Sequence, residues 1–238
     1  MDESEKIAEK YLLSLGLGVV DFEPDGNVPP DFSVGGIVAV EVRRLNQNYE
    51  FSDGRVQGLE ETSIPLLDKM KKRLSSIGPS LNGECWYVGL SYGRPMKNWK
   101  ILWPQIEEWL RLFMLKEERF PISTKIDDCI EIDLIKSGKD HGFFYVLGAS
   151  VDEDSGGWVF QELERNLLYC VSEKEQKILP YLSKYERWWL VLVDNVAYGL
   201  DQEDRDEFRR YVQPKISTVF EKIVLLSPLG NGQSFEVR

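Results

Sequence analysis

The sequence predicts a mixed α/β fold, and two observations support this prediction. Segments with apolar residues at helical spacing alternate along the chain with short apolar segments typical of strands. The first 91 residues follow the order helix, three strands, helix, strand, and a sheet with helices on its faces buries such elements. With 238 residues, of which 42% are hydrophobic, the chain is long enough for a sizeable core.

The first elements are predicted from the spacing of apolar residues and from glycines that end a helix or form a turn. A helix over 3–15 is followed by two glycines, and a short strand over 17–22 comes next. A hairpin then covers 31–34 and 37–44, and the polar residues 46–57 are expected to form a loop.

The remaining elements continue the alternation. A helix over 59–76 ends before a Gly-Pro pair, and a buried strand covers 84–91. Residues 128–136 and 142–151 are expected to form a second hairpin. The other predicted elements are helices over 99–115, 158–182 and 203–213, with strands over 187–193 and 222–226.

A single domain is predicted over residues 1–238, because no repeat, low-complexity segment or linker interrupts the chain. Residues 1–92 would form its core. Residues 93–238 would form an α/β elaboration of the same sheet or a small subdomain.

Composition narrows the classes of protein. A net charge of −11 argues against loose, charge-driven binding of nucleic acid. It is compatible with a local basic groove, for which the candidates are Arg43-Arg44 and the run 69–73. The latter run is also typical of a solvated helix face. Three scattered cysteines (Cys85, Cys129 and Cys170) fit neither a zinc site nor a disulfide framework. We expect a cytoplasmic protein without signal peptide or membrane segment.

The first predicted hairpin has two registers that differ in where its carboxylates lie. A two-residue turn would place Asp31 beside Val40, on the apolar face. A three-residue loop pairs Val34 with Val38 and places Asp31 directly opposite Glu41. The second register is favoured because it keeps the valines on one face.

Two opposed carboxylates repel each other unless a cation lies between them. Mg²⁺ is suited to this position, since it binds one or two carboxylates together with water and phosphate oxygens. A solvent-facing polar stripe on an edge hairpin is the alternative explanation of Asp31 and Glu41.

The arrangement resembles the PD-(D/E)xK motif of the restriction-endonuclease-like nuclease superfamily, with Pro30-Asp31 followed by Glu41-Val42-Arg43. The resemblance covers roughly the first 90 residues and implies a core of helix, three strands, helix and strand. It implies Asp31, Glu41 and Arg43 as catalytic residues and Mg²⁺ (or Mn²⁺) as cofactor.

The first predicted helix extends the resemblance. In many members a glutamate of this helix contacts the metal, in a pattern that is matched here by Glu5, Ala8, Leu12 and Gly16. The implied metal ligands are therefore Glu5, Asp31 and Glu41, with Glu9 as a substitute for Glu5 one turn later.

Arg43 departs from the family pattern, which has a lysine at this place. A guanidinium stays protonated, so Arg43 could stabilise phosphate charge but could not act as a general base. In some members the lysine lies on a neighbouring helix, and the candidates here are Lys69, Lys72, Lys174 and Lys177.

Two functions follow as expectations. The first is a metal-dependent endonuclease that hydrolyses phosphodiester bonds in DNA or RNA. The second is an inactive nuclease-like fold that binds protein or nucleic acid, as a homodimer or with a protein partner. An amine that reaches Asp31 and Glu41 would favour the first function. Acidic surroundings of this pair, with Arg43 as the nearest cation, would favour the second function.

A serine hydrolase is a further alternative. Residues 89–93 read Gly-Leu-Ser-Tyr-Gly, and the single histidine, His141, follows in the chain. Arg94-Pro95 stands where the nucleophile motif requires the start of a helix, so the match is weak.

Overall fold

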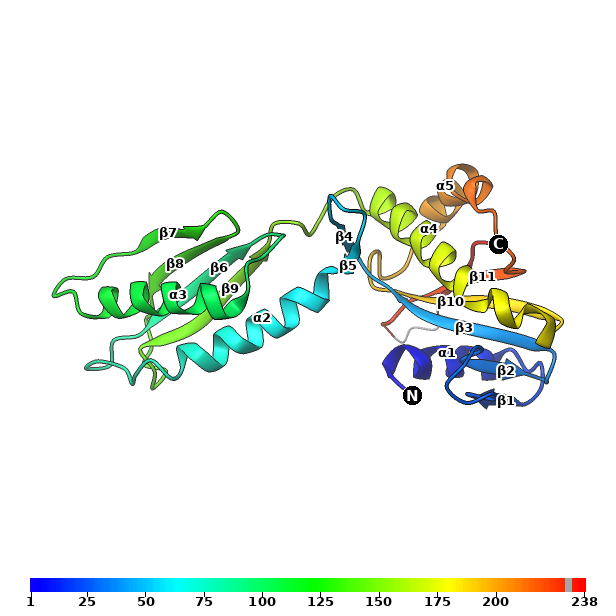
Figure 1. Cartoon of the computed structure of the whole chain (residues 1–238), viewed down its shortest axis with the longest axis horizontal. Coiled ribbons are helices and arrows are strands. Elements are labelled where there is room, and N and C mark those ends of the chain that lie inside the picture. The colour runs from blue at the N-terminus through cyan, green and yellow to red at the C-terminus, as the bar shows by residue number, and fades with distance from the viewer. Residues whose placement is uncertain (230–232) are drawn as a thin grey trace. The chain divides into compact units, whose positions relative to one another are not determined.

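The computed structural model describes residues 1–229 and 233–238, which form two compact units. Unit 1 comprises residues 1–47 and 157–238, and unit 2 comprises residues 48–156 (Figure 1). This division differs from the predicted single domain with a core over residues 1–92. The reason is that the segment after residue 47 builds a sheet and a hydrophobic core of its own, and the chain then returns to the first sheet.

Unit 1 is built on a six-stranded sheet with the order β1-β2-β3-β10-β11-β12. β2 is antiparallel to both its neighbours, β3, β10 and β11 are parallel, and β12 is antiparallel to β11. Its strands are β1 (Val20–Phe22), β2 (Phe32–Val34), β3 (Val38–Leu45), β10 (Arg187–Asp194), β11 (Lys222–Leu226) and β12 (Ser234–Glu236). Its helices are α1 (Glu3–Ser14), α4 (Val159–Ile178) and α5 (Gln202–Tyr211), with short turns η1 (Leu179–Lys184) and η2 (Gln213–Lys215).

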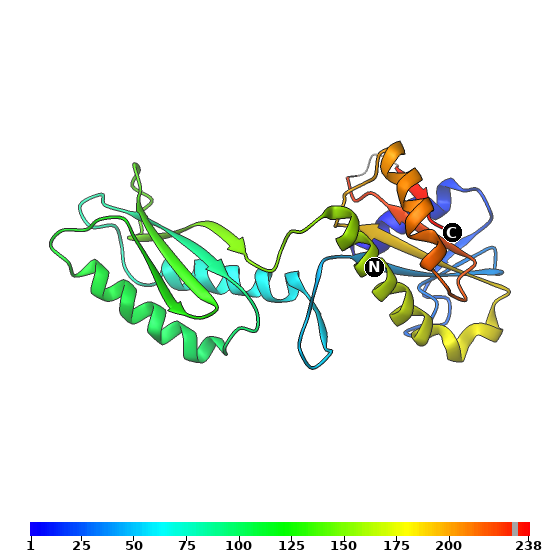
Figure 2. The same cartoon turned by 90° about the horizontal axis from the view of Figure 1, so that it is seen from above.

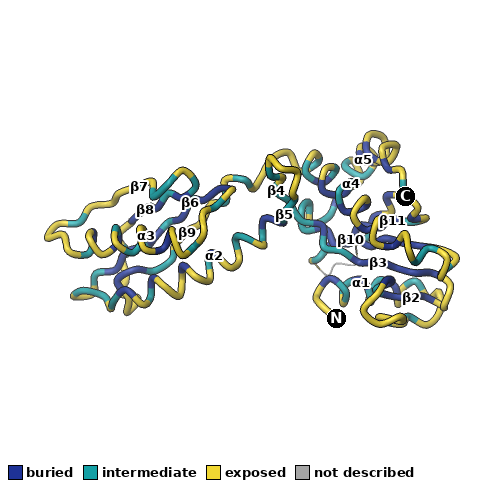
Figure 3. The backbone as a smooth tube through the Cα atoms, viewed as in Figure 1, coloured by how far each residue is buried: buried dark blue, intermediate teal, exposed yellow. Residues whose placement is uncertain are grey.

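Helices cover both faces of this sheet, which gives three layers (Figure 2). On one face, Ala8 and Leu12 of α1 pack against the valines of β2 and β3. On the other face, α4 and α5 pack against the alternate residues of β3, β10 and β11, such as Ala39 and Leu190. The two faces of β3 are therefore buried under different helices, and most of β3 and β10 is buried (Figure 3).

The hairpin has the predicted register, in which a three-residue loop joins β2 and β3. Val34 pairs with Val38 and Phe32 with Val40, as burial of the valines on one face requires. Gly35 and Gly36 in the loop have positive φ (59° and 69°), which glycine adopts readily.

Unit 2 is a four-stranded sheet with both of its helices on one face. The sheet order is β7-β8-β6-β9, and α2 and α3 pack on the side chains of Trp86, Val88 and Leu90. The elements are α2 (Leu59–Leu74), β6 (Trp86–Tyr92), α3 (Trp99–Met114), β7 (Ile122–Asp127), β8 (Ile130–Lys136) and β9 (Tyr145–Asp152). None of the helices in the described residues is long and apolar enough to cross a membrane.

Two predictions about unit 2 are corrected, and one strand is additional to the predicted elements. The expected loop over 46–57 contains a small hairpin, β4 (Asn48–Glu50) and β5 (Val56–Gly58). β8 and β9 do not pair with each other, because β6 lies between them, antiparallel to β8 and parallel to β9. The additional strand is β7, which is short and has no fully buried residue, although Ile122 and Ile126 follow a strand-like alternation.

Glu84 of unit 2 provides a test by pH. A hydrogen bond from Arg119 (2.9 Å) holds the pKa of this carboxyl at about 2, against an ordinary 4.5. A lowered folded-state pKa gives stability that is present above pH 4.5 and lost as the pH falls through about 2. We expect Arg119→Gln to raise the pKa of Glu84 towards 4.5, as followed by NMR of the carboxyl group. An unchanged pKa in this variant would contradict the assignment.

Candidate active site

Asp31 and Glu41 lie across from each other on neighbouring parts of the hairpin in unit 1. Asp31 comes directly before β2, one residue beyond the Phe32–Val40 pair, so it faces Glu41. Its Oδ2 accepts a hydrogen bond from the backbone N–H of Val42 (2.7 Å). The pair that the register predicts is therefore present.

Two lysines of α4 reach this carboxylate pair. Nζ of Lys174 lies 2.6 Å from Oε2 of Glu41 and 3.5 Å from Oδ2 of Asp31. Nζ of Lys177 lies 3.1 Å from the same oxygen of Glu41. The charge repulsion between the two carboxylates is thus relieved by an ammonium group that contacts both.

The sequence of α4 explains why Lys174 points at the sheet. Its buried residues recur at helical spacing, and Lys174 falls on this stripe between Cys170 and Ile178. A lysine is almost never buried without a partner. Its place on the apolar stripe was the signal that could have selected Lys174 among the four candidate lysines.

Glu41 has a vacant acceptor at this site. Its side chain is 0% exposed, and both lysines bond to Oε2. Its Oε1 is buried and has no hydrogen-bond partner among the described residues. A buried oxygen without a partner is costly, and carboxylate oxygens are ligands that hard cations such as Mg²⁺ bind.

The surroundings tune the charge of Lys177. Its partial burial favours the neutral amine and would lower its pKa, but the negative charges of Glu41 and Asp31 outweigh this effect. The pKa of Lys177 is consequently raised above 10.5, and the group stays protonated at neutral pH. Burial also raises the pKa of the neighbouring Cys170 thiol, to about 11, which makes it a packing residue rather than a nucleophile.

Arg43 lies two residues beyond Glu41 on β3 and is held by α4. Its guanidinium forms an ion pair with Glu173 and lies over the ring of Tyr169, 5.5 Å from the centroid. A quarter of its side chain is exposed. Arg43 therefore borders the carboxylate pair as a cation, and the two amines of α4 lie closer to Glu41.

Glu5, the third predicted metal ligand, does not join the pair. It caps α1, where its carboxylate accepts from the backbone N–H of Asp2 and its own N–H donates to Asp2 Oδ1. α1 covers the valine face of the sheet, whereas Glu41 points to the face under α4. The structure therefore does not bring Glu5 to the carboxylate pair, and Glu9 lies on the same helix. The described residues contain no group of three or more His, Cys, Asp or Glu side chains that could hold a metal ion.

The other candidates lie in unit 2. Lys69 and Lys72 belong to α2, not to the helix that carries the amines. Ser91 lies within β6, and the chain continues through Arg94-Pro95 before the next helix begins, so the nucleophile turn is not formed. His141 contacts Tyr87 and Ser137 rather than Ser91.

Comparisons of the chain with protein-family models, with curated proteins and with solved structures give no match.

Proposed function

We propose that this protein is a metal-dependent phosphodiester hydrolase that acts on DNA or RNA, with Asp31 and Glu41 as the ligands of Mg²⁺ or Mn²⁺. The observation that carries the proposal is the contact of Lys174 with both carboxylates, 2.6 Å from Glu41 and 3.5 Å from Asp31. An acidic pair with an amine in reach is the combination that the nuclease motif requires, and the amine is supplied here by α4.

The order of elements in unit 1 supports the proposal. The nuclease resemblance implies helix, three strands, helix and strand, and unit 1 has α1, β1, β2, β3, α4 and β10 in that order. The sequence-based prediction assigned the second helix and fourth strand to α2 and β6. With α4 and β10 in these places, residues 48–156 become an insertion between β3 and the second helix.

The residues have distinct parts in this proposal. A bound divalent ion would supply a nucleophilic water at neutral pH and would neutralise charge on the phosphate. Glu41 could coordinate this ion through its free Oε1. Asp31 could coordinate it through Oδ1, because Oδ2 of Asp31 accepts the hydrogen bond from Val42. Lys174 holds Glu41 Oε2 and orients the pair, while Arg43 at the border is placed to attract the phosphate backbone.

One observation favours the second function, a nuclease-like fold that binds without cleavage. The ammonium groups of Lys174 and Lys177 both pair with the carboxylate of Glu41. Lysine side chains can thus compensate this charge, and a binding protein with the same ion cluster would show no cleavage.

A cleavage assay separates the two functions. Supercoiled plasmid, single-stranded DNA and RNA are incubated with the wild type in Mg²⁺, Mn²⁺ or EDTA. We expect metal-dependent cleavage of at least one substrate, and a loss of about 100-fold or more in Asp31→Asn and Lys174→Met. Lys215→Met, which removes a lysine paired with Glu164 elsewhere on unit 1, is the control with wild-type rate. Lack of cleavage with either metal, in protein that is folded by circular dichroism, would favour the binding function.

A further inference from the structure

Unit 2 contains a hollow of about 550 Å³ between α2 and the segment 141–147. Lys71 and Lys72 line the wall formed by α2, together with Asp68 and Ser75. These four residues are neighbours on one face of the helix. Phe143, Val146 and Leu147 line the opposite wall, and His141 lies beside them. The hollow thus combines adjacent cations with an apolar surface.

The cations of this hollow are not neutralised by the protein. Among the described residues, the ammonium groups of Lys71 and Lys72 form no ion pair or hydrogen bond, and the one carboxylate in the lining is Asp68. The hollow of unit 1 beside α4 differs in this respect, because its Lys215 is paired with Glu164 at 2.5 Å. In a chain of net charge −11, two adjacent free lysines make the hollow of unit 2 a local site for anions.

The opposite wall offers an apolar surface. Phe143 is 45% exposed although it is a large hydrophobic residue. His141, two residues earlier in the chain, contacts Tyr87, whose hydroxyl lies 2.8 Å from Nε2. An exposed aromatic ring beside lysines is the combination that binds a nucleic-acid strand, with bases stacked on the ring and phosphates on the cations.

We infer that this hollow binds single-stranded nucleic acid, with backbone phosphates at Lys71 and Lys72 and a base on Phe143. The inference rests on the proposed function and assigns the insertion a part in substrate binding. A single strand is the occupant because a stacked, paired base of a duplex does not present its face to a side chain. The charge of the two lysines matches a phosphate backbone, which repeats one negative charge per nucleotide next to a base whose flat face can stack.

The test is fluorescence anisotropy of a labelled 20-nucleotide single strand in EDTA, over a range of salt concentrations. Each phosphate contact on a single strand contributes about 0.7 to the slope of log K against log salt. Lys71→Gln/Lys72→Gln is therefore expected to reduce the slope by about 1.4. Phe143→Ala is expected to weaken binding by about tenfold. Asp68→Asn, which removes the repelling carboxylate, is expected to tighten it.

Matched controls come from the same unit. Lys100→Gln/Lys125→Gln removes two unpaired lysines, and Phe120→Ala removes an exposed phenylalanine, none of which lines the hollow. Equal losses in controls and hollow variants would overturn the inference, as would tighter binding of poly-glutamate or of duplex DNA than of the single strand. Binding through the hollow without cleavage in Mn²⁺ would overturn only the proposed function. Cleavage and strand binding that are both unaffected by the hollow variants would overturn only the inference.

Discussion

Lys174→Met is expected to lower the free energy of unfolding of unit 1 by about 3 kcal/mol. The substitution keeps the length and apolar stem of the side chain but removes the ammonium that bridges Glu41 and Asp31. Glu41 is 0% exposed, so its charge would remain in the core with Lys177 as its remaining cation. Loss of one partner of a buried ion pair costs more than the pair contributes, because the other charge stays desolvated. Urea unfolding followed by circular dichroism measures the change.

A double-mutant cycle isolates this interaction. Glu41→Gln/Lys174→Met removes both charges, so its loss of stability is expected to be smaller than the sum of the single losses by about 1–3 kcal/mol. Lys215→Met, whose lysine is half exposed and paired with Glu164, should cost less than about 1 kcal/mol. If Lys174→Met lowered the free energy of unfolding as little as Lys215→Met, the ion pair of Lys174 and Glu41 would not contribute to stability as a buried pair.

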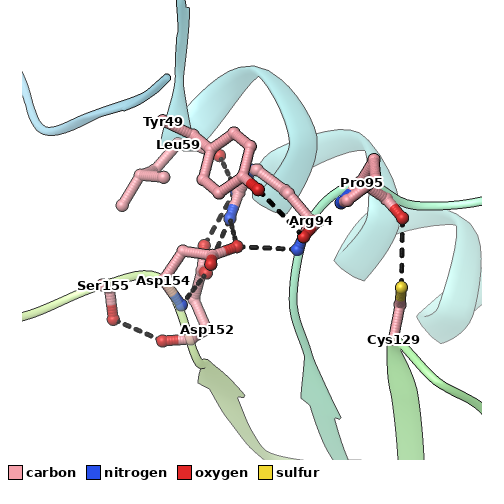
Figure 4. A network of polar contacts seen from close by, with 8 residues as sticks. All are labelled: Tyr49, Leu59, Arg94, Pro95, Cys129, Asp152, Asp154 and Ser155. Atoms are coloured by element: carbon pink, nitrogen blue, oxygen red, sulfur yellow. Dashed lines mark hydrogen bonds and ion pairs between the residues drawn. The ribbon is translucent and has the colours of Figure 1, made fainter. Parts of the chain in front are cut away.

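Arg94→Met is expected to destabilise unit 2 by about 3–5 kcal/mol. The guanidinium is 1% exposed and is paired with Asp152 (2.7 Å) and Asp154 (3.1 Å), as Figure 4 shows. It also donates to the backbone carbonyl of Leu59 at the start of α2 (2.7 Å). The substitution would leave the carbonyl of Leu59 without the guanidinium donor and the two carboxylates with backbone N–H donors and no paired cation. It would thereby remove the polar link between α2 and the end of β9. Arg94→Lys should not restore stability, because one ammonium cannot reproduce the forked contacts.

Hydrogen exchange localises this effect. Amides of β6 and β9 should exchange faster in Arg94→Met, since these strands end at the network. Arg111→Met is the matched control, because Arg111 pairs with Glu107 on the exposed side of α3. Exchange rates of unit 2 that do not differ between the two variants would contradict a structural part for Arg94.

The sequence is sufficient for the parts of the site that depend on local rules. Alternation of valines along β3 fixes the hairpin register, and the register alone brings Asp31 opposite Glu41. Most helices and strands also form where apolar spacing predicts them, because the period of the apolar residues shows which face of each element is buried.

The long-range parts could not be predicted in the same way. Residues 48–156 contain a helix and a buried strand in the order that the fold requires, so apolar spacing alone assigns them to the first sheet. The neighbour of β3 on the side away from β2 is β10, which follows more than a hundred residues later. Spacing along α1 does not show which face of the sheet the helix covers, so it could not place Glu5 relative to Asp31 and Glu41.

Calorimetric titration with Mn²⁺ of the wild type and of Asp31→Ala tests whether Asp31 and Glu41 bind a metal ion. We expect micromolar to millimolar binding at one site in the wild type, because Asp31 and the free Oε1 of Glu41 are available as ligands. We expect Asp31→Ala, folded by circular dichroism, to bind no Mn²⁺. Absence of binding in the wild type, or equal binding in the variant, would contradict a metal site at this carboxylate pair.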